Sequence, residues 1–149
     1  MNWTKDKSIT LSLVCIIIFA LLLLILDIFC YPLTRWFIGL RAMHWQQGIG
    51  MMATVYVCSI FAWIALLNLW RLLANLRRGE VFTAKNVRLM RGVSWCCVGA
   101  AMMCLISTIW YVPFAFVAIA AGFMALIVRI VKNVFQQAIS MKDELDLTI

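Results

Sequence analysis

Four long apolar runs, separated by short polar segments, dominate the pattern of this chain. They cover about residues 9–29, 49–70, 93–109 and 114–131. Each is close to the ~20 residues that an α-helix needs to cross a hydrocarbon core of ~30 Å. A helix also pairs its own backbone polar groups, which a bilayer requires. The pattern therefore predicts an all-α integral membrane protein, a four-helix bundle forming a single domain over residues 1–149.

The first run ends at a proline, and a weaker apolar pattern follows it. Because proline interrupts helical hydrogen bonding, we expect the first helix to stop at Tyr31-Pro32. Over residues 30–48, apolar side chains recur at three- and four-residue steps, which is typical of an amphipathic helix. We therefore predict a short helix lying in the membrane interface between the first two spans. The side chains of this stripe are Leu33, Trp36, Phe37, Leu40 and Met43.

The segment between the second and third runs carries clear helix-boundary signals. The second helix is expected to continue to Arg77-Arg78, because Gly79 permits the left-handed turn that ends many helices. Thr83 is a candidate N-cap for a new helix that runs into the third span. We call residues 77–91 the elbow, and we predict that it is folded.

The last two spans are joined by almost no loop, so they must be antiparallel neighbours. Ala118, Gly122 and Ala125 place small residues on one face of the fourth helix, and such residues let membrane helices approach closely. This face is the predicted packing contact within the bundle or in a homo-oligomer. Residues 132–149 keep an apolar stripe beside polar positions, which predicts a cytoplasmic helical extension that ends in an acidic tail, residues 142–149.

Composition and charge agree with a membrane protein. Of the 149 residues, 66% are hydrophobic, and the mean hydropathy is +1.01. The spans leave no room for a separate enzymatic domain. Segments 1–8, 71–92 and 129–149 hold two, six and three of the 13 Lys and Arg residues, and residues 30–48 hold the other two. The positive-inside rule therefore places both termini and the elbow in the cytoplasm. It also explains the net charge of +7 without direct nucleic-acid binding.

Candidates for catalysis or metal binding are few. His44 is the only histidine, which excludes multi-imidazole sites within one chain; it is either an ordinary interfacial residue or a pH sensor at the outer face. The six cysteines lack a Cys-x-x-Cys pattern, so packing explains them better than redox or copper chemistry. We therefore predict no catalytic residue, cofactor or metal.

One acidic residue, Asp27, lies inside a span, and intramembrane ionisable residues are functional candidates by default. Counted along the first helix from Ile9, Asp27 falls near the outer interface, where it can pair with Arg35 or Arg41. Together with His44, these residues form a predicted polar site at the outer face.

The elbow and the tail carry opposite charges on the same predicted side of the membrane. They can pair with each other or form a joint docking surface, while the elbow's basic residues alone suit contact with anionic lipid headgroups. The predicted partner-binding residues are Arg77, Arg78, Glu80, Phe82, Thr83, Asn86, Arg88 and Arg91 in the elbow and Asp143, Glu144 and Asp146 in the tail.

The elbow segment from Gly79 to Arg91 and the terminal Glu144-Leu-Asp-Leu-Thr-Ile149, set around four hydrophobic spans, resemble the bacterial membrane family called domain of unknown function 2975. The family often has Asn where Leu145 stands here. The resemblance implies a bacterial plasma-membrane location and a neighbouring gene for a small helix-turn-helix regulator, but no established activity.

Three function classes follow. The first is a non-enzymatic regulator or sensor that engages membrane lipids and a cytosolic partner, such as a helix-turn-helix regulator. The second is a transport or self-protection accessory protein that binds a lipophilic compound within the bundle. The third, a membrane enzyme, lacks paired acids, an activated nucleophile or metal-ligand spacing. Transporters concentrate polar residues at mid-membrane, whereas polarity here lies mostly at the cytoplasmic end, which favours the regulator.

Overall fold

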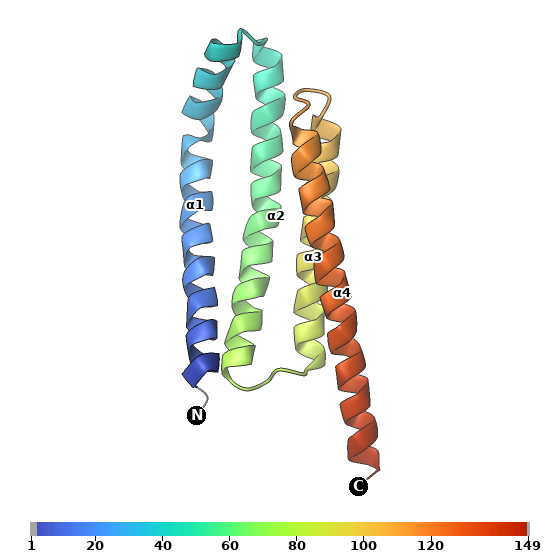
Figure 1. Ribbon diagram of the computed structural model, residues 1–149. Helices are drawn as coiled ribbons and strands as arrows, with labels where there is room; N and C mark the ends of the chain where they lie inside the picture. The colour runs from blue at the N-terminus through green and yellow to red at the C-terminus, as the bar shows by residue number, and fades with distance from the viewer. Residues whose placement is uncertain (1–2, 149) are drawn as a thin grey trace.

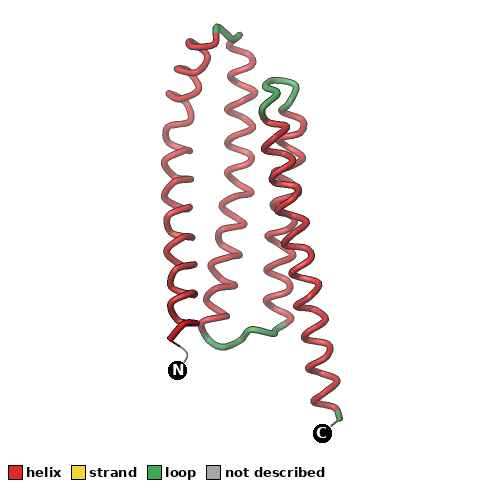
Figure 2. The backbone as a smooth tube through the Cα atoms, viewed as in Figure 1, coloured by secondary structure: helices red, strands yellow, loops and turns green. Residues whose placement is uncertain are grey.

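The computed structural model describes residues 3–148 and contains four α-helices and no strand among them. The helices are α1 (Trp3–Arg41), α2 (Trp45–Arg77), α3 (Ala84–Ser107) and α4 (Phe114–Leu147). Figure 1 shows them side by side with alternating directions, and Figure 2 shows how short the connecting loops are. All four are long and apolar enough to cross a membrane. The chain is therefore a multi-pass membrane protein with the predicted all-α, four-helix architecture.

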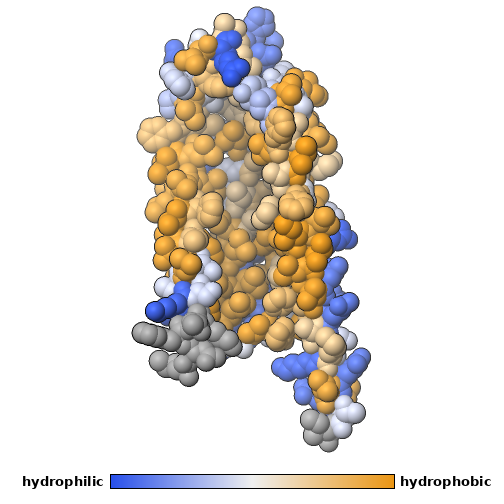
Figure 3. All heavy atoms as spheres, viewed as in Figure 1, coloured by the Kyte–Doolittle hydropathy of each residue, from blue (hydrophilic) through white to orange (hydrophobic). Residues whose placement is uncertain are grey.

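The surface of the molecule is apolar where a soluble protein would be polar. In the most apolar 18-residue stretch of α1, none of the residues is buried inside the protein. Leu22 and Ile28 are exposed by 55% and 64%. Hydrophobic residues cover most of the face shown in Figure 3. Exposing apolar surface to water costs about 25 cal/mol per Å², so these helices require lipid around them.

Pro32 does not end the first helix. α1 continues through it to Arg41, so the separate interfacial helix predicted over residues 30–48 is in fact the last part of α1 and the first turn of α2. In lipid, a helix is favoured even across a proline, because an unwound backbone would leave polar groups unpaired. Beside the proline, Thr34 donates a hydrogen bond to the Cys30 carbonyl at 2.7 Å. The last turns of α1 lean toward α2 (Figure 1).

The helices pack in chain order, so the bundle is open. α1 contacts α2, α2 contacts α3 and α3 contacts α4, whereas within the described residues no other pair of helices comes close along its length. α1 therefore has only one neighbouring helix. The ring of Phe37 in α1 does reach the turn between α3 and α4, where it meets Tyr111 edge-on with 5.6 Å between ring centroids.

Two glycines on α3 let it approach α2 closely. A Cβ atom on Gly99 would lie 2.8 Å from the Phe61 ring, and one on Gly92 would lie 2.7 Å from the Asn68 amide nitrogen. Polar side chains also connect the two helices, as where the hydroxyls of Thr54 and Ser107 lie 2.5 Å apart. Small residues and interhelical hydrogen bonds are the usual means of helix association in lipid.

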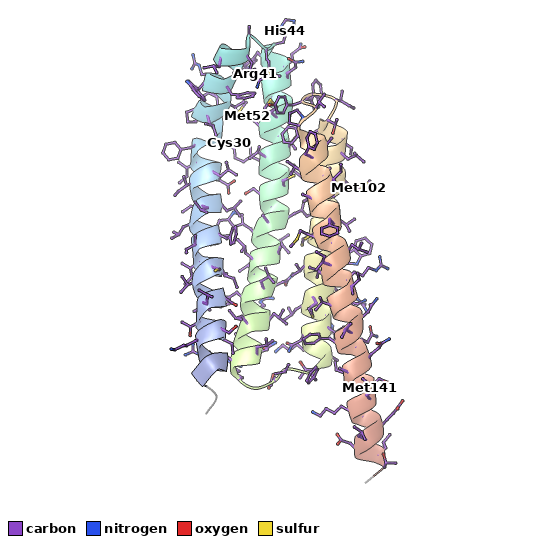
Figure 4. The ribbon with its side chains drawn as sticks, in the orientation of Figure 1. Cys30, Arg41, His44, Met52, Met102 and Met141 are labelled. Carbon is purple, nitrogen blue, oxygen red and sulfur yellow. The ribbon has the colours of Figure 1, made fainter. Side chains whose placement is uncertain are left out.

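α4 extends past the other three helices. We call the end of the bundle that carries the elbow the elbow end, and α4 projects from it toward the C-terminus (Figure 1). The helix runs without a break to Leu147, and its side chains Met141 and Leu145 are exposed by 59% and 66%. Figure 4 labels Met141 on this projecting part.

Candidate functional site

The elbow begins with a defined helix end. Gly79 adopts a φ of +82°, in the left-handed region. Its N–H bonds to the Leu76 carbonyl, and the Glu80 N–H reaches back to the Asn75 carbonyl, both at 3.1 Å. This is the Schellman pattern, which pairs the last carbonyls of a helix. The predicted role of Gly79 in ending α2 is confirmed.

The buried side chain of Asn86 connects the parts of the elbow through hydrogen bonds. It is fully buried, and its amide nitrogen donates to the carbonyls of Glu80 at 2.6 Å and Val81 at 2.9 Å. Its amide oxygen accepts from the side chain of Asn75, which is also buried, at 2.8 Å. One side chain therefore joins the end of α2, the loop and the start of α3.

The start of α3 and the position of α4 are fixed at the same place. Thr83 is the N-cap of α3, as predicted, and its hydroxyl accepts from the Asn86 N–H at 3.4 Å. The Phe82 ring lies 5.6 Å from the Phe135 ring of α4, measured between centroids. The elbow is thus a folded element attached to three helices, and not a loose linker.

The charged side chains of the elbow point outward. Arg77, Arg78, Glu80, Arg88 and Arg91 are all exposed. The tail residues Asp143, Glu144 and Asp146 are exposed as well. Asp143 lies eight residues beyond Phe135, which is about 12 Å along α4. The structure therefore separates the acidic tail from the elbow along α4. Both charged groups remain available to other molecules.

Asp27 lies on α1 opposite the middle of α2. Its carboxylate accepts hydrogen bonds from the Ser59 hydroxyl at 2.6 Å and from the Trp63 indole N–H at 3.1 Å. Ser59 is ten residues from Ile49 and eleven from Trp70, which bound the second apolar run. At 1.5 Å per residue, Asp27 is therefore level with the middle of this run, about 15 Å from either end of it.

These contacts place Asp27 further from the end of the second span than the predicted position at the outer interface. The prediction was made by counting residues along the first helix from Ile9. Because α1 is longer than a membrane is thick, the depth of each residue depends on how α1 is aligned with α2. The predicted partners Arg35 and Arg41 are exposed and lie eight and 14 residues further along α1. The guanidinium of Arg41 lies 5.7 Å from the centre of the Phe37 ring.

His44 is at the end of the bundle opposite the elbow. It is the N-cap residue of α2, and its backbone N–H donates to the Gln47 side chain at 3.3 Å. Figure 4 shows His44 and Arg41 together at the connection between α1 and α2. Asp27, by contrast, is 14 residues before the end of α1, which is about 21 Å along the helix. The structure does not bring the four predicted outer-face residues into one site.

The predicted small-residue face of α4 is only partly used. Ala118 and Ala125 are buried, and the Ser94 hydroxyl of α3 donates to the Ala125 carbonyl at 3.1 Å. Gly122 has no neighbour within 4 Å of a Cβ placed on it, so it is not a close-contact position within the chain. The glycines that do permit close packing are Gly92 and Gly99. The sequence signal for them was their seven-residue spacing, which equals two helical turns.

Two thiols meet between α2 and α3. The sulfur atoms of Cys58 and Cys104 are 3.6 Å apart, and all six cysteines are free. Among the side chains that the structure describes, residues 7–148, no group of three or more His, Cys, Asp and Glu is placed to hold a metal ion.

Comparisons with known proteins add one match. Residues 9–149 match the model of a protein family described as a protein of unknown function, DUF2975. No curated protein and no solved structure matches the chain. The match covers all four helices except the first turns of α1.

Proposed function

The chain belongs to the DUF2975 family, and we propose that it is a non-enzymatic regulator or sensor of the bacterial plasma membrane that engages a cytosolic partner through its elbow and its acidic tail. In this proposal both termini and the elbow face the cytoplasm, because eleven of the 13 Lys and Arg residues lie at the elbow end.

The observation that carries the proposal is the internal locking of the elbow by Asn86. A segment whose only task was to supply positive charge for topology would need no fixed shape, since headgroup attraction tolerates sequence changes. Here a fully buried side chain makes three hydrogen bonds that fix the loop. A fixed loop presents its exposed arginines in a constant arrangement, which a specific protein partner requires.

The projecting end of α4 supports the same function. Its acidic residues stand clear of the elbow, and the helix carries exposed apolar side chains beside them. Such a surface is complementary to a basic protein face, which DNA-binding regulators carry for contact with phosphates. A small helix-turn-helix regulator therefore fits the charge of the tail.

A cross-linking pull-down from native membranes tests this proposal. Two variants are compared with the wild type: reversal of Arg77, Arg78 and Arg88 to Glu, and deletion of residues 143–149. We expect both to insert normally, since the remaining cytoplasmic Lys and Arg still outnumber the external ones, and both to lose the partner. The matched control reverses Arg35 and Arg41 at the far end and should recover the partner like the wild type.

Unchanged partner recovery in both variants, at normal membrane levels, would refute the regulator proposal. Reduced headgroup binding with the same recovered proteins would show that the elbow only anchors to lipid, because that attraction is screened by salt and tolerant of sequence.

A second candidate function is favoured by Asp27. Carboxylates within membrane-spanning helices mark many ligand and ion sites. Asp27 is such a polar group away from the elbow end, so polar residues are not confined to the elbow end. In this alternative, the protein binds a lipophilic compound within the bundle as a transport or self-protection accessory. Such compounds should then raise the melting temperature of the wild type and not of Asp27→Asn. A panel that shifts neither protein argues against this alternative.

A further inference from the structure

A groove between α3 and α4 gathers three cations near the elbow end. Its volume is about 430 Å³, and its lining residues are Arg91, Ser94, Trp95, Val98, Arg129 and Lys132. No acidic residue is among the described residues that line it. Like charges around one hollow repel each other, and an anion placed between them relieves that repulsion.

A second groove continues from the first along the same two helices. It has a volume of about 310 Å³ and shares Val98 with the cationic groove. Its other lining residues are apolar: Ala101, Met102, Leu105, Ala118, Ile119, Gly122 and Ala125. On α3, residues 91, 95, 98, 102 and 105 recur at three- and four-residue steps, so they lie on one face of the helix. The two grooves thus form one channel along the outside of the α3 and α4 pair.

The channel matches the membrane in depth and direction. Arg91 lies two residues before the third apolar run, and Arg129 and Lys132 lie on either side of the end of the fourth. The cations therefore lie near the boundary between hydrocarbon and headgroups, while the apolar groove runs into the hydrocarbon region. Met102, in the apolar part, is 56% exposed and lies beside α4 in Figure 4. At Gly122 a Cβ would meet nothing within 4 Å, which leaves the floor of the groove open. Trp95 is 68% exposed at the cationic end, where aromatic side chains favour the interface.

We propose that this channel binds an anionic phospholipid, with its phosphate between Arg91, Arg129 and Lys132 and one acyl chain along the apolar groove. Guanidinium and ammonium groups are the usual partners of phosphate, and basic pockets between transmembrane helices bind anionic headgroups. A free phosphate would use only the cationic part. The continuous apolar part favours a phosphate that carries an acyl chain. The site shares Arg91 with the elbow. The docking test above varies Arg77, Arg78 and Arg88, so the two proposals can fail separately.

A lipid titration tests the proposal. Phosphatidylglycerol is added to the purified, delipidated protein in a zwitterionic detergent, and its affinity is measured. Phosphatidylcholine with the same acyl chains and inorganic phosphate are titrated in separate experiments. A basic residue near an anionic headgroup contributes a factor of about 5 in affinity. We therefore expect Arg91→Gln with Arg129→Gln to weaken phosphatidylglycerol binding by about 25-fold. Phosphatidylcholine should bind much more weakly than phosphatidylglycerol to the wild type.

The matched control is Lys85→Gln with Lys142→Gln, which also removes one cation from α3 and one from α4, at positions that do not line the channel. This control should bind phosphatidylglycerol like the wild type. Equal weakening in both double variants would show only general charge attraction and would overturn the proposal. Stabilisation by inorganic phosphate equal to that by phosphatidylglycerol would also overturn it, in favour of a free-anion site.

Gly122→Leu tests the acyl-chain part separately. Because a Cβ at this position would meet no side chain and no other helix within 4 Å, the variant should melt like the wild type without lipid. With phosphatidylglycerol it should gain less thermal stability than the wild type, since leucine fills the floor of the groove. A lipid-dependent gain equal to that of the wild type would exclude the apolar groove as an acyl-chain site and so contradict the proposal.

Discussion

Asn86→Ala should loosen the elbow without unfolding the spans. The substitution removes the two hydrogen bonds from the Asn86 amide to the Glu80 and Val81 carbonyls, and the one that Asn86 accepts from Asn75. A hydrogen bond contributes about 1 kcal/mol net, and a buried donor left unpaired costs more. Because Asn75 is buried, we expect the free energy of opening the elbow to fall by about 3 kcal/mol.

Limited proteolysis and hydrogen exchange at residues 78–86 measure this opening. Where cleavage follows the population of the open form, a loss of about 3 kcal/mol raises the rate by roughly 150-fold. Asn133→Ala, an exposed position on α4, is the control and should change stability by no more than about 0.5 kcal/mol. Asn86→Asp keeps the acceptor for Asn75 but loses both donations, so it should also loosen the elbow. Proteolysis of Asn86→Ala at the wild-type rate would refute the claim that this side chain locks the elbow.

Three features of the bundle give further expectations. Gly99→Leu should lower the free energy of unfolding in detergent by about 1–3 kcal/mol, because leucine would overpack against Phe61. Gly122→Leu in lipid-free detergent should leave the free energy of unfolding unchanged. Equal melting temperatures for the two variants would contradict the close packing of α2 and α3. A double-mutant cycle of Asp27→Ala and Ser59→Ala should give a coupling energy of about 1 kcal/mol, which is the scale of interhelical hydrogen bonds in membranes. A coupling energy near zero would show that this contact does not stabilise the packing of α1 on α2. The Asp27→Ala variant alone should also increase the accessibility of α1 to hydrogen exchange, because α1 has only α2 as a neighbouring helix.

The number of spans and the helix ends at the elbow could be predicted because they depend on local sequence. A helix in lipid pairs its own backbone polar groups, so an apolar run of sufficient length is strong evidence for a membrane-spanning helix. Gly79 and Thr83 act within a few residues of themselves. The helix end predicted at Pro32 is wrong because the rule that proline ends a helix holds for helices in water, where the chain can unwind at little cost, whereas α1 continues to Arg41.

The features that depend on register between helices could not be predicted in the same way. The depth of Asp27 is set by its pairing with Ser59 and Trp63, which the sequence of α1 alone does not contain. The small residues of α4 indicated a packing face, yet only two of the three are buried, since the crossing of α3 and α4 leaves Gly122 at an open groove. The periodicity of the sequence also did not determine which helices pack together, apart from α3 and α4.

The proposed docking function requires one orientation, in which the elbow and the acidic tail both face the cytoplasm and the connection between α1 and α2 faces outward. Single cysteines at positions 40, 80 and 145, in a background with the six native cysteines replaced, can be labelled with a membrane-impermeant thiol reagent in intact cells and after lysis. We expect Leu40→Cys to react in intact cells and Glu80→Cys and Leu145→Cys to react only after lysis. Labelling of position 80 in intact cells would contradict the proposed orientation and remove the elbow as a surface for a cytosolic partner.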